Sequence, residues 1–205
     1  MTFSGEPKTR WIAESNGERR MTLLDEFWFT DRAGRRWTAP EGAIIDGASI
    51  PRALWTTVGS PYTGQYRRAS IVHDVACENA ANPEERRAAD KMFFEACRAG
   101  GCSRAEAMIL YMGVRVGSAW SRQALDAVTY EASDRPRLHR TAVDVKTEGD
   151  FRLATELLLA GGETDDPEEL ERRADEAIAA VVARDRAFHD LIQPAPIDRP
   201  LPRPR

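Results

Sequence analysis

The chain has 205 residues, of which 42% are hydrophobic and 30% are charged, a composition that excludes disordered and fibrous proteins. A net charge of -4 argues against a dedicated nucleic-acid-binding protein, and three cysteines without CxxC spacing argue against a disulfide scaffold or a structural zinc site. No apolar run reaches the roughly 18–20 residues of a membrane helix, and no signal peptide is evident. We therefore expect a reduced cytoplasmic protein.

The N-terminal part has the pattern of β structure. Met21–Thr30 is rich in aliphatic and aromatic residues, a turn signal follows at Asp31–Gly34, and Arg35–Ala39 returns. A second turn and the short apolar segment Ala43–Ile45 complete a predicted meander of two or three strands. So small a sheet needs a packing partner.

Three helices are predicted in the middle of the chain. The first covers Gln65–Asn79, and the second begins with Asn82 as N-cap and ends at Gly100-Gly101. A capping box at Ser103–Glu106 opens the third. One stripe of the first helix holds Tyr66, Ala69, Ser70, His73 and Cys77.

The C-terminal part differs from the rest in charge, with 12 basic and 18 acidic side chains over residues 123–205. We predict a core domain at 1–132, a polar linker at 133–150, an acidic helical appendage at 151–192 and a disordered Pro-rich tail at 193–205. The core is expected to fold without the appendage. The apolar stripe of the last helix must pack on the core, on a second copy or on a partner.

These elements predict an α+β fold. A small N-terminal antiparallel sheet packs on a helical core with a helix hairpin, and C-terminal helices and a Pro-rich tail follow.

The helix hairpin carries the best candidate for chemistry. His73 lies eight residues before the connection near Ala81, and Asp90 lies nine residues after it. In an antiparallel pair the two side chains are level, about 12–13 Å from the turn. Asp90 can then fix the tautomer of His73 and stabilise its cation, as behind a general base. The alternative is a structural hydrogen bond.

A cation site is the second candidate. Asp74 points about 100° away from His73 and is free to bind a cation. Asp46, followed by Gly47 in a loop, is a second oxygen ligand for a hard cation or an ordinary turn residue. If the two carboxylates converge, calcium or an arginine, Arg52 or Arg86, must lie between them.

Several motifs together resemble a known family. They are GAIIDGASIPR at 42–52, Leu54-Trp55, His73-Asp74, the helix Arg86–Asp90 with Phe93, and Tyr111 with Val114-Arg115. The combination, which covers about Met21–Trp120, resembles the phage and prophage family catalogued as domain of unknown function 1353. This resemblance implies a protein of the cytoplasm or of a virion, with a phage or bacterial protein partner.

The HD helix with a later Asp on an antiparallel helix is also similar to secreted phospholipase A2. That resemblance implies that His73 is the base that activates water, Asp90 orients it, and Asp74 ligates calcium with Asp46 or the Gly47 carbonyl. The family's supporting Tyr falls at Cys77, and its disulfides are absent.

Three functions compete at this stage. The first is a hydrolase of lipid or cell-envelope esters, with calcium as its cofactor and the membrane only as substrate. The second is a non-enzymatic phage structural or accessory protein, whose C-terminal helix docks a partner. The third is a small regulatory or immunity protein.

A thiol nucleophile at Cys77 is a further alternative to a buried cysteine. A hydrolase needs His73 in an open cleft, whereas a structural network buries it.

Overall fold

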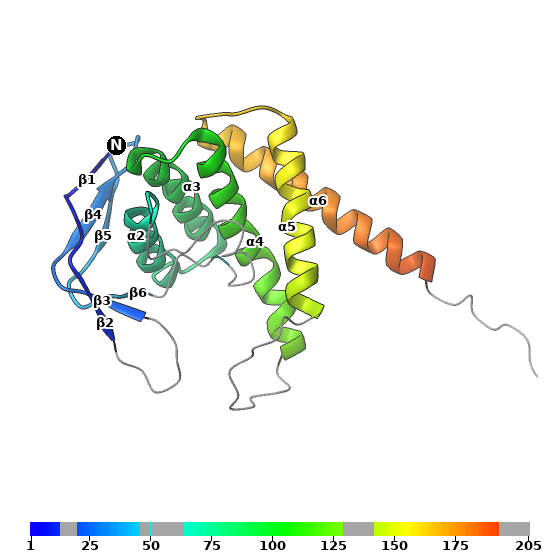
Figure 1. Cartoon of the computed structure of the whole chain (residues 1–205), viewed down its shortest axis with the longest axis horizontal. Coiled ribbons are helices and arrows are strands. Elements are labelled where there is room, and N and C mark those ends of the chain that lie inside the picture. Colours follow the sequence, from blue (N-terminus) through cyan, green and yellow to red (C-terminus); the bar gives the residue numbers. More distant parts are fainter. Residues whose placement is uncertain (13–19, 46–49, 51–63, 129–141, 193–205) are drawn as a thin grey trace, which may run out of the picture.

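The computed structural model describes residues 1–12, 20–45, 50, 64–128 and 142–192. These residues form two small antiparallel sheets followed by five helices, which confirms the α+β class with an N-terminal sheet. Figure 1 shows the strands at one end of the molecule, α2 and α3 beside them, and α4, α5 and α6 beyond. The helix hairpin therefore lies between the sheets and the C-terminal helices.

The strands are β1 (Thr2–Phe3), β2 (Thr9–Ile12), β3 (Arg20–Leu23), β4 (Phe27–Thr30), β5 (Arg36–Ala39) and β6 (Ile44–Ile45). One sheet has the order β1-β4-β5 and the other β2-β3-β6. The predicted single segment Met21–Thr30 is therefore wrong, because Leu24–Glu26 divides it into two strands of different sheets. Both strands still alternate as a half-buried strand should, with Met21 and Leu23 buried in one and Phe27 and Phe29 in the other.

The three central helices are α2 (Arg67–Glu78), α3 (Pro83–Gly100) and α4 (Arg104–Val128). Their predicted caps are confirmed: the Asn82 side chain accepts from the Glu85 N–H at 2.9 Å, and Ser103 Oγ accepts from the Glu106 N–H at 3.1 Å. The end of α3 approaches the start of α2 so closely that a Cβ on Gly100 would lie 2.5 Å from the Gln65 carbonyl oxygen. Only glycine fits this crossing.

The last two helices are α5 (Ala142–Ala160) and α6 (Pro167–Ile192). The predicted linker at 133–150 is wrong over residues 142–150, which are helical. Its polar texture belongs to ion pairs: Asp150 is buried and bound by Lys146 and by Arg184 of α6. Oppositely charged residues four positions apart stabilise a helix. They also make the segment as polar as a linker, which is why the sequence did not reveal this helix.

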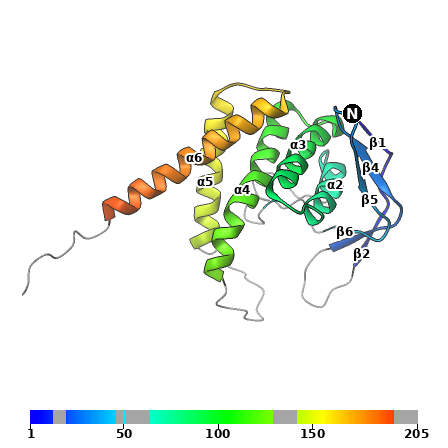
Figure 2. The same cartoon turned by 180° about the vertical axis from the view of Figure 1, so that it is seen from behind.

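The apolar stripe of α6 packs within the same chain. Leu170, Ala174, Ala177 and Val181 are buried and belong to one hydrophobic cluster that also includes the sheets. α6 contacts α3, α4 and α5, and Figure 2 shows its far end extending beyond the other helices. The core therefore continues past the predicted boundary at residue 132, which itself lies outside the described residues, as does the tail at 193–205.

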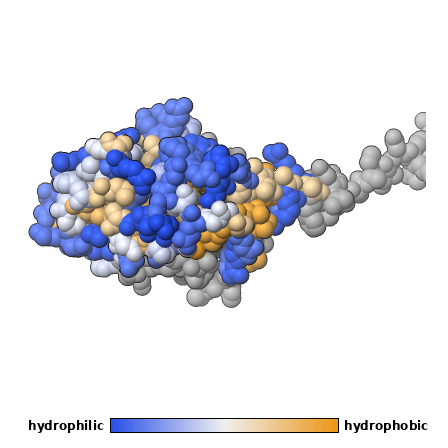
Figure 3. Space-filling model, turned by 90° about the horizontal axis from the view of Figure 1, so that it is seen from above, coloured by the Kyte–Doolittle hydropathy of each residue, from blue (hydrophilic) through white to orange (hydrophobic). Residues whose placement is uncertain are grey.

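The surface is mostly polar. Figure 3 shows hydrophilic residues over most of the visible face, with a hydrophobic area where α6 leaves the body. Within the described part of the chain, no helix has both the length and the hydrophobicity needed to cross a membrane.

Candidate functional site

His73 of α2 and Asp90 of α3 form a buried pair. The His73 Nε2–H donates to Asp90 Oδ1 at 2.9 Å, and neither side chain has any exposed surface. The predicted contact across the helix hairpin is therefore confirmed at hydrogen-bond distance. The catalytic role of the pair stays a prediction.

Cys77, one turn after His73, joins this pair. Its Sγ lies 3.2 Å from His73 Nε2 and 3.8 Å from Nδ1. The imidazole, the thiol and the Asp90 carboxylate each offer one donor atom, and these atoms all lie within 4.8 Å of one another. The Phe93 ring covers the imidazole, with ring centroids 4.8 Å apart. Sequence reasoning treated Cys77 as a neighbour of the site, whereas the structure makes it a member.

Asp90 is held from its other side as well. Arg115 of α4 donates to Asp90 Oδ2 at 3.3 Å and to Asp175 Oδ1 of α6 at 2.6 Å. Arg87 then binds Asp175 at 2.7 Å and Glu171 at 3.1 Å, and Lys91 binds Glu171 at 3.2 Å. We call this alternating series the charge chain: His73, Asp90, Arg115, Asp175, Arg87, Glu171, Lys91 and Glu168.

The charge chain runs from the core to the surface. Its first two members are fully buried, and its last, Glu168, has a side chain that is 75% exposed. The charge chain links α2, α3, α4 and α6. Asp175 of α6 reaches Asp90 through one intermediate, Arg115.

Sequence reasoning missed the members on α6, although a signal existed. Arg87 and Lys91 on α3 are four residues apart, and so are Glu171 and Asp175 on α6. Each spacing places two like charges on one helix face, and like charges side by side are unfavourable without a complementary face opposite. Matching these two faces would have indicated the contact between α3 and α6.

Ionisation follows from these contacts. Burial by itself lowers the pKa of His73, but the neighbouring Cys77 and Asp90 outweigh it and raise that pKa to about 10. For Asp175, burial raises the pKa, and the bonds from Arg87 and Arg115 lower it below its usual value.

The predicted cation ligands are described only in part. Asp74 is buried next to His73. Asp46, Gly47 and Arg52 lie outside the described residues, so a calcium site built from them stays a prediction. The one described residue of that loop, Ile50, is buried and packs on α4, where a Cβ on Gly113 would lie 3.5 Å from its side chain.

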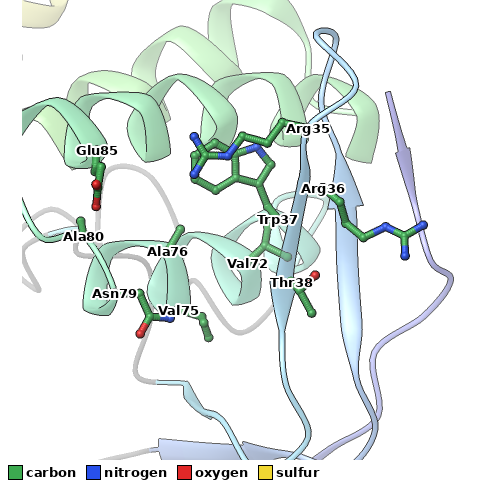
Figure 4. Close-up of a pocket in the computed structure, with 10 residues that line it drawn as sticks. All are labelled: Arg35, Arg36, Trp37, Thr38, Val72, Val75, Ala76, Asn79, Ala80 and Glu85. Atoms are coloured by element: carbon green, nitrogen blue, oxygen red, sulfur yellow. The ribbon is translucent and has the colours of Figure 1, made fainter.

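A cavity of about 190 Å³ lies between β5 and α2. Figure 4 shows Arg35, Trp37 and Glu85 around it, with Ala76 of α2 and Asn79, the residue after this helix, along one side. The Arg35 guanidinium stacks 3.7 Å from the Trp37 ring centroid. Neither His73 nor Asp90 is among the residues that line this cavity, so it lies beside the buried pair and does not open onto it.

Comparison with known proteins finds a family model that matches part of the chain. Residues 21–114 match the family described as Protein of unknown function (DUF1353), the one that the sequence motifs indicated. Two similar proteins come from Sinorhizobium fredii (strain NBRC 101917 / NGR234). Uncharacterized protein y4jT is 34% identical over 123 residues, which cover 58% of this chain and 35% of that protein. Uncharacterized protein y4iH is 30% identical over 92 residues, which cover 45% of this chain and 38% of that protein.

The chain thus spans little more than a third of the length of these two relatives. No solved structure matches it.

Proposed function

We propose that this chain is a non-catalytic accessory module of a phage- or prophage-type protein, in which the charge chain fixes the helices relative to one another. The observation that carries this proposal is the complete burial of both His73 and Asp90. A general base must reach a substrate or a water next to it, and a fully enclosed imidazole does neither.

The bonding of Asp90 supports the same conclusion. One carboxylate oxygen accepts from His73 and the other from Arg115, so each oxygen has a cationic partner on a different helix. Buried ion pairs contribute little net stability, but they impose one arrangement on the groups that they join. In this role the pair selects a single packing of α2, α3 and α4.

The extent of the similarity supports a module. The family match ends at residue 114, within α4, whereas α5 and α6 lie beyond it. The relatives carry further sequence outside the matched part. We assign strands β4 to β6, most of β3 and the helix hairpin, which the family match covers, to the shared module. The projecting end of α6 is the surface for a phage or bacterial protein partner, in the cytoplasm or in a virion.

One observation favours a second candidate, a hydrolase of lipid or cell-envelope esters. Asp90 binds Nε2 of His73, which leaves Nδ1 as the nitrogen that would activate water. Asp74, Asp46 and the Gly47 carbonyl would then hold calcium beside it. This candidate requires the imidazole to become neutral and accessible when substrate binds.

A direct assay separates the two. The full chain is incubated with phospholipid vesicles and with a chromogenic short-chain ester, with calcium and with a chelator, beside His73→Gln and the α6 control His189→Gln. The accessory role predicts no turnover above the His73→Gln background, together with a lower melting temperature for His73→Gln alone. Calcium-dependent turnover that disappears in a folded His73→Gln variant would establish the hydrolase instead.

A further inference from the structure

We infer that His73, Cys77 and Asp90 form a binding site for a zinc-class transition metal, shared between α2 and α3. This goes beyond the accessory role, because a bound ion would cross-link the two helices whatever surface the module presents. It also differs from the predicted calcium site, whose residues are Asp74, Asp46 and Gly47.

The donor set fits such an ion. An imidazole nitrogen, a thiolate sulfur and a carboxylate oxygen are the three ligand types that zinc binds in proteins. The thiolate excludes calcium and magnesium, which take oxygen ligands. His73 and Cys77 are four residues apart on one helix, the spacing that places two ligands on one face. CxxC spacing, the usual sequence signal, is not needed here because the third ligand comes from the neighbouring helix.

The distances fit as well. Tetrahedral zinc with bonds of about 2.0–2.3 Å holds its donor atoms about 3.3–3.6 Å apart. His73 Nε2 lies 2.9 Å from Asp90 Oδ1 and 3.2 Å from Cys77 Sγ, and all three donors lie within 4.8 Å of one another. The two separations from His73 Nε2 thus differ by about half an ångström from those of a tetrahedral zinc site, so small side-chain shifts would adjust them.

The charges and the outer hydrogen bonds of the site favour occupation. His73 Nε2 and the Cys77 thiol each release a proton to solvent when the ion binds. The neutral imidazole, one thiolate and one carboxylate then neutralise a divalent ion, so the loaded site carries no net charge into the core. Asp90 keeps its bond from Arg115, and Arg115 keeps its own counter-charge in Asp175. An outer hydrogen bond of this kind orients a carboxylate ligand.

The site also has an approach. Cys77 retains 8% of its surface exposed, although His73 and Asp90 are fully buried. Of the three ligands Cys77 has the most exposed surface, so an ion would enter past its thiol. Three protein ligands leave the fourth tetrahedral position for water.

The test uses cobalt(II) as a coloured substitute for zinc. The full chain is stripped with a chelator and titrated with cobalt(II), then with zinc(II), beside Cys77→Ser and the control Cys102→Ser, which alters a buried cysteine outside the site. We expect a thiolate-to-cobalt charge-transfer band that saturates at one ion per chain and is displaced by zinc. Cys77→Ser should lose this band and weaken zinc binding by at least about tenfold, whereas Cys102→Ser keeps both.

Two results would overturn the inference. One is a folded wild-type chain that develops no charge-transfer band. The other is a band that survives in Cys77→Ser, which would assign the thiolate to another cysteine. If Cys77→Ser does not fold, Asp90→Asn and the double variant Cys97→Ser/Cys102→Ser replace it. The inference then requires Asp90→Asn to weaken cobalt binding and requires the double variant to retain the band.

Discussion

Helix α3 carries ion pairs on two faces, and the two faces differ in how far water is excluded. Toward α2, Asp90 meets His73 with both side chains fully buried. Toward α6, Arg87 and Lys91 meet acidic partners whose side chains are 16–75% exposed. Water screens the second set and leaves each pair worth about 0–1 kcal/mol, whereas a broken buried pair leaves an uncompensated charge. Loss of an ion pair should therefore lower the free energy of unfolding more on the α2 face than on the α6 face.

The largest loss of stability should follow from deleting the C-terminal helices that cover the α6 face of α3. Truncation after residue 132 deletes the buried side chains of Phe151, Leu158, Leu170 and Val181. Each contributes about 1.5–3 kcal/mol by burial, a sum comparable to the whole stability of about 5–15 kcal/mol. We expect an insoluble or molten product, by yield and near-ultraviolet circular dichroism. A soluble truncated chain with a cooperative melt would restore the independent core expected from the sequence.

The α2 face should be the most sensitive to a single substitution. Asp90→Ala leaves His73 and Arg115 buried without their shared partner, so we expect a loss of about 3–5 kcal/mol in the free energy of unfolding in urea. The double variant His73→Leu/Asp90→Leu removes the charge of the pair and should lose less. Equal losses would show that packing, not charge, determines the stability of this face.

Acid should act mainly on the α6 face. Because the folded-state pKa of Asp175 is lowered, its ion pairs stabilise the fold above the ordinary value of 3.8 and are lost as the pH falls through the lower folded value. Asp175→Asn should therefore be less stable than the wild type at pH 7, and the two should converge in strong acid. Urea titrations at both pH values measure this. A difference that does not change with pH contradicts it, and Asp25→Asn in the sheet region is the control.

The smallest effect should come from the outer end of the charge chain. Lys91→Ala removes contacts to Glu168 and Glu171, of which Glu168 is mostly exposed. We expect a loss below about 1 kcal/mol that shrinks further at high salt, measured by thermal melts at two ionic strengths. A loss as large as that of Asp90→Ala would remove the distinction between the two faces.

The sequence predicted local structure well because its signals were local. Asn82 and Ser103 cap helices where expected, and the His73–Asp90 contact follows from counting along two helices joined by a short turn. Those predictions needed only the geometry of the helix and of its ends.

The rest depended on contacts between distant segments. Nothing near Arg115 in sequence indicates that its second partner is Asp175, on a helix that resembled a separate acidic appendage. The division of Met21–Thr30 between two sheets likewise depends on where β1 and β2 pair, in a part of the chain for which no strand was predicted. Cys77 joined the site only when the side-chain distances were known.

The bond between Arg115 and Asp175 also determines when the fold can be completed during synthesis of the chain. The two residues are 60 positions apart, so a ribosome adding about 5–20 residues per second makes the aspartate about 3–12 s after the arginine. During that interval the helix hairpin can form, Arg115 can bind Asp90 but not Asp175, and the apolar surface that α6 will cover is open. The nascent chain therefore completes its core late, and its exposure to aggregation or to a chaperone is set by how quickly its C-terminal third is translated.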